Sequence, residues 1–346
     1  MLERSIEITY LDCINLTLKE AMRLDSSIFL CGVETKVFGS LDGICDEFGE
    51  KRCFALPICE EAGLGFALGA STQGLRPVVN HIRVDFLLLA FNQLINMIGP
   101  ARHSTNGALS VPLVIRAIIG RGWGQGHQHS KSLQGILRQI PGIKVFMPTS
   151  PQNVHDVLIY ALNASHPTVI LEHRWLYWQK GRVTFHSDSP KAIEPSWLNR
   201  GSEVTVVSTS WMTVEVMAAS HQLKRRNISL DVFDPVDVVD PDLTLIFQSV
   251  RKTGLCIIVD NDWQDASFST WIASKIYDHC NQKIKKPIAR IGFAQVPCPT
   301  ARELEREFYP NSQKILFEIE KLLELPHENM PEELIFTHEN RFYGPF

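Results

Sequence analysis

The feature that most constrains the fold is a regular alternation of short apolar runs with longer amphipathic segments. Residues 27–32 (SIFLCG), 76–82 (RPVVNHI) and 111–119 (VPLVIRAII) are short and apolar, which is typical of buried strands. Residues 58–74, 132–140 and 150–163 follow in the alternation and have the pattern of helices. Ser150 is a candidate N-cap for the last of them, with Pro151 in its first turn. Alternation of this kind predicts an α/β protein with mostly parallel sheets and helices on both faces.

The alternation lapses once, and this lapse divides the chain. Residues 178–201 are polar, contain two prolines and show no period, so they are expected to be a linker. A second alternating block follows, with apolar runs at 203–210 and 255–260. We therefore expect two α/β domains with mostly parallel sheets, over residues 1–180 and 201–326, joined by a linker over 181–200 and followed by a tail over 327–346.

Composition narrows the class of protein. With 45% hydrophobic and 21% charged residues, the chain has the balance of a globular protein rather than a disordered one. Its net charge of −4 argues against a nucleic-acid partner, and no apolar run approaches the ~20 residues that cross a membrane. We expect a cytoplasmic protein whose eight cysteines, none in a C-x-x-C pair, are reduced thiols.

Common catalytic motifs are absent, and two segments stand out instead. The chain has no G-x-x-x-x-G-K-S/T, H-E-x-x-H or G-x-S-x-G pattern. The first segment is PICEEAGLGFALGAS (57–71), which places Glu60 and Glu61 at the start of a helix containing three glycines. Each glycine costs a helix about 1 kcal/mol against alanine, so a close approach by another backbone or a ligand is expected. A first-turn carboxylate is also common on a solvated surface, and the pattern alone leaves both interpretations open.

The second segment is GHQHSKS (126–132), which enters from a glycine-rich turn after an apolar strand. Loops at the carboxyl ends of parallel strands are where α/β proteins bind ligands, and histidine suits proton transfer near neutral pH. His127 and His129 are therefore candidates, although ordinary loop histidines fit equally well. Phe86 follows a strand and is either a core residue or a stacking wall for a flat ring.

Taken in order, these and further segments resemble one family. They are PICEEAGLGFALGA (57–70), GLRPVVNHIRVDF (74–86), GQGHQHSKS (124–132), HPTVILEH (166–173) and VPCPTA (296–301). The chain resembles the beta subunit of thiamine-diphosphate-dependent 2-oxo acid dehydrogenases, a transketolase-like family that includes pyruvate, branched-chain and acetoin dehydrogenases. The resemblance runs from about residue 6 to residue 325 and implies a transketolase pyrimidine-binding domain followed by a transketolase C-terminal domain.

The resemblance also implies roles for individual residues. Glu60 matches the glutamate that hydrogen-bonds the cofactor's aminopyrimidine ring, and Phe86 matches the aromatic residue that stacks on it. His129 matches a histidine on the substrate side, so Glu60 and His129 are the expected catalytic residues. Glu34 is a weaker match to an acidic residue of a cofactor-binding turn. A carboxyl group at Glu60 would share a proton with the pyrimidine ring, and burial would favour this by raising its pKa.

The implied activity is decarboxylation of a 2-oxo acid and transfer of its acyl group to lipoamide. The chain lacks the G-D-G and N-N motifs through which the family binds diphosphate and Mg²⁺. The resemblance therefore implies a partner alpha subunit that carries both motifs, an α2β2 heterotetramer with a beta–beta contact, and a lipoyl acyltransferase as a further partner. No metal ligand is expected in this chain.

Some positions depart from the family pattern. Arg121 and His127 are not expected from the family, and Arg83 stands just before 84–86 (VDF), where the pyruvate enzymes tend to have F-N-F. Arg83, Arg121 and Lys131 would form a pocket for an anionic substrate, with His127 as a further substrate candidate, or an ordinary charged surface. These departures keep a second function open, the small subunit of a two-component transketolase-like or acyloin-forming carboligase. A non-catalytic scaffold is a third interpretation, against which the joint presence of Glu60, Phe86 and His129 argues.

Overall fold

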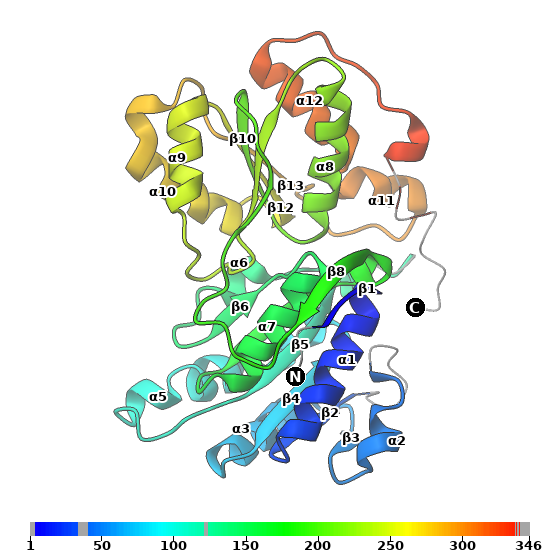
Figure 1. Ribbon diagram of the computed structural model, residues 1–346, viewed down its shortest axis with the longest axis vertical. Helices are drawn as coiled ribbons and strands as arrows, with labels where there is room; N and C mark the ends of the chain where they lie inside the picture. The colour runs from blue at the N-terminus through cyan, green and yellow to red at the C-terminus, as the bar shows by residue number, and fades with distance from the viewer. Residues whose placement is uncertain (1–3, 34–40, 121–123, 336, 338, 340–346) are drawn as a thin grey trace. The chain divides into compact units, whose positions relative to one another are not determined.

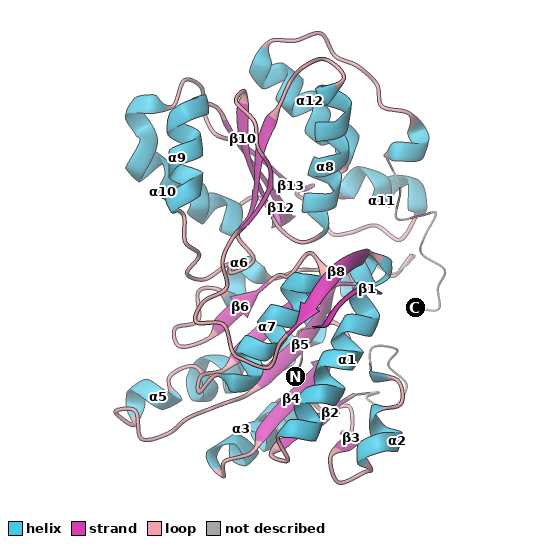
Figure 2. Ribbon diagram, in the orientation of Figure 1, coloured by secondary structure: helices cyan, strands magenta, loops and turns pink. Residues whose placement is uncertain are grey.

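The chain forms two compact α/β units, as the alternation predicts (Figure 1). The structure is a computed structural model and describes residues 4–33, 41–120, 124–335, 337 and 339. The first unit comprises Met1–Gly120 and Leu137–Ile193, and the second comprises Arg121–Ile136 and Glu194–Phe346. Each unit has a central sheet between helices, which confirms the expected fold class (Figure 2).

The first unit is built on a six-stranded parallel sheet. Its central strands are buried along their whole length, which explains their near-continuous apolar sequences. In spatial order the strands are β3 (Cys53–Ala55), β2 (Ile28–Gly32), β4 (Arg76–His81), β5 (Val114–Ile119), β7 (Thr168–His173) and β6 (Lys144–Phe146).

Helices cover both faces of this sheet. Helices α1 (Tyr10–Leu24) and α7 (Pro151–Asn163) pack side by side on one face (Figure 1). The Ser150 hydroxyl accepts the Asn153 amide, and the Asn153 side chain accepts the Ser150 amide, so α7 begins with a capping box. Other helical segments are α2 (Ile44–Phe48), α3 (Glu60–Thr72), α4 (Val84–Leu87), η2 (Leu88–Ala90), η3 (Gln93–Ile98), α5 (Ala101–Ser104) and η5 (Arg174–Trp178).

The apolar stretch over residues 86–99 is less regular than its sequence suggests. It is divided among α4, η2 and η3, and η3 is a π-helix. In the described part of the chain no single helix is long and apolar enough to cross a membrane. One bent pair, Val84–Ala90 with Gln93–Ser104, meets the criteria of length and composition.

A buried ion pair lies in the middle of the first sheet. The guanidinium of Arg116 on β5 donates to both carboxylate oxygens of Glu172 on β7, at 2.6 and 2.8 Å. It also donates to Asn80 Oδ1 at 3.0 Å, and the Tyr177 hydroxyl donates to Glu172 at 3.0 Å. Both charged side chains are at most 2% exposed, so their charges are balanced almost entirely by one another.

The second unit has a five-stranded mixed sheet. Four strands are parallel and the edge strand β9 is antiparallel. In spatial order they are β13 (Ala289–Phe293), β12 (Cys256–Trp263), β10 (Val204–Ser208), β11 (Leu230–Asp234) and β9 (Ser196–Asn199). Its helical segments are η4 (Gly126–Gln128), α8 (Trp211–Lys224), α9 (Thr244–Thr253), α10 (Phe268–Cys280), η6 (Asn281–Lys283), α11 (Arg302–Phe308), α12 (Ser312–Leu323) and η7 (Glu332–Leu334).

Three local expectations differ from the structure. The segment read as a linker without regular structure contains β8 (Lys180–Phe185) and β9, and β8 pairs with β1 (Arg4–Thr9) near the start of the chain. Residues 132–140 form only a short helix, α6 (Gln134–Leu137). Cys45 and Cys53 form a disulfide rather than two reduced thiols, because their strand and helix bring the Cα atoms to 4.9 Å.

Candidate active site

Helix α3 presents Glu60 at the carboxyl edge of the first sheet. The preceding loop is tied to β2 by the Leu56 amide, which donates to the Gly32 carbonyl at 2.9 Å. Glu61 accepts from Gln93 Nε2 at 3.0 Å, whereas the Glu60 carboxylate has no hydrogen-bond partner among the described residues. Glu60 is partly exposed in this chain, so the burial expected for it is incomplete here.

Phe86 is more exposed than is usual for a phenylalanine. It belongs to the short helix α4 rather than to a strand end, and the residue is 37% exposed. Arg83, just before α4, is 4% exposed and donates from Nη1 to the Gly120 carbonyl at 2.8 Å. This bond fastens the start of α4 to the end of β5. It also shows that at least one guanidinium donor of Arg83 serves the fold.

Some buried polar atoms in the described part of the first unit have no hydrogen-bond partner there. Among them are His81 Nε2, at the end of β4, and Gln93 Oε1. Burial lowers the pKa of His81 to about 4, so its imidazole is neutral at pH 7. The partly exposed Glu60 carboxylate, the exposed Phe86 and buried polar atoms without a hydrogen-bond partner suit the binding of a flat heterocycle with hydrogen-bonding edges.

The second unit carries the histidine loop. His129 follows the turn η4 and is partly exposed, while His127 is exposed. A pocket of about 410 Å³ opens beside this loop. Its lining combines basic side chains with an apolar wall: His127, Ser130, Lys131, Trp263, Gln295, Val296, Pro297, Cys298 and Phe308. The Trp263 indole donates to the Val296 carbonyl at 3.3 Å, which fixes that wall.

The predicted site residues thus divide between the two units. Glu60, Phe86 and Arg83 belong to the first unit, and His127 and His129 belong to the second. Glu34 and Arg121 lie outside the described residues.

Sequence reasoning missed an acidic group at the end of β12. Asp260, Asn261 and Asp262 are all buried and contact the segment that follows His129. Burial raises the pKa of Asp260. Burial, and then the charge of Asp260, raise the pKa of Asp262 to about 7. The available signal was the run of three polar residues that ends the apolar strand 255–259.

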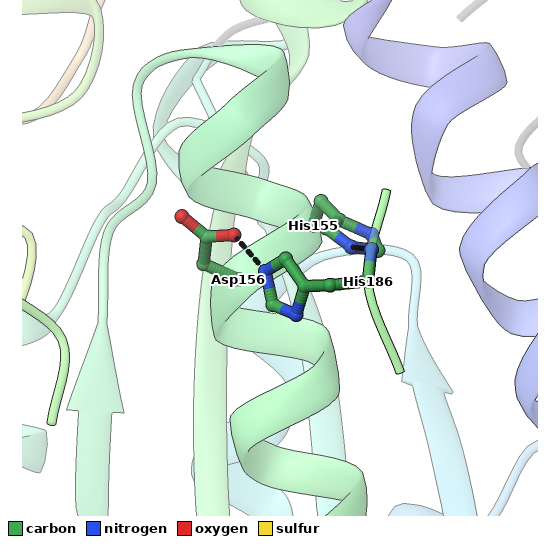
Figure 3. Close-up of side chains that lie close together, drawn as sticks. All are labelled: His155, Asp156 and His186. Carbon is green, nitrogen blue, oxygen red and sulfur yellow. Dashed lines mark hydrogen bonds and ion pairs between the residues drawn. The ribbon is translucent and has the colours of Figure 1, made fainter. Parts of the chain in front are cut away.

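A further polar cluster joins α7 to the residue that follows β8 (Figure 3). His155 Nε2 accepts the His186 amide at 3.1 Å, so its Nδ1 donates to the Thr17 hydroxyl at 2.9 Å. His186 Nε2 lies 2.8 Å from Asp156 Oδ1. These side chains are of types that bind metal ions, but their ring nitrogens already have protein hydrogen-bond partners. The cluster therefore connects α7 to the residue after β8 through hydrogen bonds.

Comparison with known proteins agrees with the two-unit architecture. A family model described as "Transketolase, pyrimidine binding domain" matches residues 6–179, and one described as "Transketolase, C-terminal domain" matches residues 196–315. The chain is 30% identical to the 2-oxoisovalerate dehydrogenase subunit beta of Bacillus subtilis, over 92% of this chain and 99% of that protein.

Two other relatives and one solved structure extend the comparison. The acetoin:2,6-dichlorophenolindophenol oxidoreductase subunit beta of Bacillus subtilis is 30% identical, over 93% of this chain and 99% of that one. The pyruvate dehydrogenase E1 component subunit beta of Gracilaria tenuistipitata is 29% identical, over 92% and 99%. A solved "split gene transketolase, inactive beta4 tetramer" has the same fold, with a TM-score of 0.72 and 19% identity over 92% of this chain and 99% of that one.

Proposed function

Because the chain belongs to the transketolase-like family of beta subunits of thiamine-diphosphate-dependent 2-oxo acid dehydrogenases, we propose that it performs that subunit's reaction with an alpha partner. It is the beta subunit of an enzyme that decarboxylates a 2-oxo acid and passes the acyl group to lipoamide. The observation that carries this is the near-complete coverage of both chains by dehydrogenase relatives. The carboligase reading is not favoured, because these relatives are named as dehydrogenase or oxidoreductase subunits.

The first unit fits the pyrimidine half of the cofactor. When bound, thiamine diphosphate supplies a thiazolium ring that accepts electrons as carbon dioxide leaves. The Glu60 carboxylate, which has no protein partner among the described residues, would hold the pyrimidine edge, and the exposed Phe86 ring would cover its face. Diphosphate and Mg²⁺ require further oxygen ligands, which we assign to the G-D-G and N-N motifs of the alpha subunit.

The chain's own residues then have separate tasks. Glu60 holds a proton at its carboxyl oxygen and exchanges it with the bound pyrimidine. Phe86 excludes water from that face. His129 orients the substrate carboxylate or holds a proton at its imidazole. Arg83, Arg121 and His127 stay predictions as ligands of an anionic substrate.

The surface of the first unit supports a partner subunit. Apolar side chains are exposed on α3, η2 and η3, among them Phe66, Leu89 and Met97 at 47–63%. A Cβ atom at Gly65 or Gly69 of α3 would meet no described atom within 4 Å, so this chain alone does not explain these glycines. Close packing against another subunit would explain them, which favours an α2β2 heterotetramer with a beta–beta contact. The acyl acceptor would be the lipoyl domain of an acyltransferase, and a cytoplasmic location stays a prediction.

Neighbouring glutamates offer a matched test. The chain is purified with its native partner, and carbon dioxide release from pyruvate and 2-oxoisovalerate is measured with and without thiamine diphosphate. We expect Glu60→Gln to lower the rate by about 100-fold or more, because positioned proton transfer contributes roughly that factor. Glu61→Gln, beside it, is expected to retain most activity. Equal activity of the two variants would contradict the role of Glu60, and lipoyl-domain acylation identifies the acceptor.

A further inference from the structure

The loop that carries His129 belongs structurally to the second unit. The family match that spans residues 6–179 includes this loop in the pyrimidine-binding domain. By its contacts, however, Arg121–Ile136 groups with Glu194–Phe346. The second unit therefore holds the segment that carries His129, through hydrogen bonds between named residues.

Residues on the carboxyl side of His129 are bonded to the end of β12. Gln134 Nε2 donates to Asp260 Oδ1 at 2.8 Å, and all four residues Ser132, Gln134, Asp260 and Asn261 are fully buried. The Gly135 amide donates to Asp262 Oδ2, and Asn261 Nδ2 donates to the Ser132 hydroxyl, both at 3.3 Å. Three consecutive residues of β12 thus each hold one residue of the loop.

The loop's backbone shows that these bonds determine its path. Leu133 has φ of +65°, a conformation that L side chains rarely adopt, and it is 4% exposed. Residues are kept in such conformations only where surrounding contacts determine them. Its two neighbours, Ser132 and Gln134, are the residues that Asn261 and Asp260 bind.

The residues beside His129 are fixed as well. The Tyr309 hydroxyl donates to the Ser130 carbonyl at 3.3 Å, and the Ser130 hydroxyl donates to the Gly126 carbonyl at 2.6 Å. Gly126 has φ of +61°, and a Cβ atom there would lie 2.6 Å from Thr300 Cγ2. His129 therefore lies between two segments that the second unit fastens.

We propose that Asp260 and Asp262 are positioning residues, which hold the loop so that the His129 imidazole is placed for the reaction. Asn261 and Tyr309 complete this clamp. The C-terminal unit thereby sets the geometry of a catalytic residue. The inference rests on the proposed function, because that function gives His129 its catalytic role.

Gln134→Glu tests the clamp directly. It places a second carboxyl group 2.8 Å from the Asp260 oxygen, so the two repel when both are ionised. The swapped double variant, Gln134→Glu with Asp260→Asn, restores one amide donor facing one carboxylate. Ser249→Ala is the matched control, because it removes a buried 2.6 Å hydrogen bond to Asp231 within the same unit.

Two measurements on the assembled complex separate the outcomes. In hydrogen–deuterium exchange, we expect Gln134→Glu to raise the amide exchange rate over residues 124–135. The swapped double variant and the Ser249→Ala control should leave that rate near the wild-type value. In steady-state assays at pH 7 to 8, we expect Gln134→Glu to lower kcat at least tenfold with little change in the cofactor concentration for half-maximal activity. The swapped double variant should recover kcat to within about threefold of wild type, since it restores a hydrogen bond between positions 134 and 260.

Unchanged exchange in Gln134→Glu would overturn the clamp, whatever reaction the complex performs. Raised exchange with kcat equal to that of Ser249→Ala would overturn the positioning role. A wild-type complex inactive towards every 2-oxo acid would refute the proposed function, and the exchange data would still decide the clamp. If Gln134→Glu does not assemble, Tyr309→Phe removes only one hydroxyl group and is expected to raise exchange at residues 126–132 and lower kcat severalfold.

Discussion

Replacing Arg116 with methionine should destabilise the first unit strongly, and the structure gives the size of the effect. Methionine keeps much of the side chain's length but removes the guanidinium that donates twice to Glu172. Among the described residues, Glu172 is then left fully buried with the Tyr177 hydroxyl as its one remaining donor. An isolated buried charge of this kind costs about 3–5 kcal/mol.

The carboxyl group can limit this cost by taking up a proton. A glutamate in the unfolded chain has a pKa near 4.3, so protonation at pH 7 costs roughly 2.7 pKa units, or about 3.7 kcal/mol. At pH 5 the same step costs only about 1 kcal/mol. Asn80 also loses a donor, which adds about 1 kcal/mol at either pH. We therefore expect Arg116→Met to lower the free energy of unfolding by about 5 kcal/mol at pH 7 and about 2 kcal/mol at pH 5.

The assay is urea unfolding of the purified chain at both pH values, followed by fluorescence and by circular dichroism. Arg116→Met with Glu172→Gln is the control, because it removes both charges and should recover much of the loss at pH 7. An equal loss at both pH values, or a double variant no more stable than the single one, would refute the argument from an uncompensated charge.

Three further outcomes follow from other groups. Burial raises the pKa of Glu215 to about 7, above its unfolded value, so the contribution of this group to the free energy of unfolding should fall by about 3 kcal/mol as pH rises from 4.5 to 7. Urea titrations should show this contribution as the difference between wild type and Glu215→Gln, because other groups, Asp262 among them, titrate over the same range. Burial and the charge of His186 lower the pKa of His155 to about 4, so the contribution of His155 to the free energy of unfolding should fall by a similar amount as pH falls from 6.5 to 4. This contribution is measured as the difference between wild type and His155→Gln. Phe86→Ala should weaken thiamine diphosphate binding to the complex several- to tenfold in cofactor titrations, whereas Phe86→Tyr keeps the ring and the affinity.

Local sequence patterns predicted the strands and helices that are determined by residues close together in the chain. Residues 27–32, 76–82 and 111–119 are strands because buried parallel strands read as continuous apolar runs, and β2, β4 and β5 lie where expected. The cap of α7 was readable because Ser150 and the Pro151 turn are adjacent in sequence. Strands β1 and β8 were missed because each is defined by a partner some 175 residues away, as in the pair Ile6 and Val183.

The candidate site also has a part that local sequence predicts and a part that depends on contacts between distant residues. Glu60 and the histidine loop are recognisable because motif residues are consecutive, and the structure gives Glu60 and Phe86 the partial exposure that a ligand site needs. The roles of these residues remain predictions. The bonds of Asp260 and Asp262 to the loop had no local signal, because they join residues 126 and 127 positions apart. The disulfide was missed because cysteine spacing alone does not report Cα separation.

The discontinuous second unit has a consequence for how the chain is made and how it is dissected. On the ribosome, residues 121–136 emerge well before β12 is synthesised. This loop therefore cannot form its hydrogen bonds to β12 until that strand has also been made. A gene cut between the two family domains would separate the loop from Asp260 and Asp262 in both products. A fragment that begins near residue 194 would have an exposed acidic strand end in place of the loop. A useful fragment of the second unit therefore needs residues 121–136 grafted back, as a supplied peptide or through circular permutation.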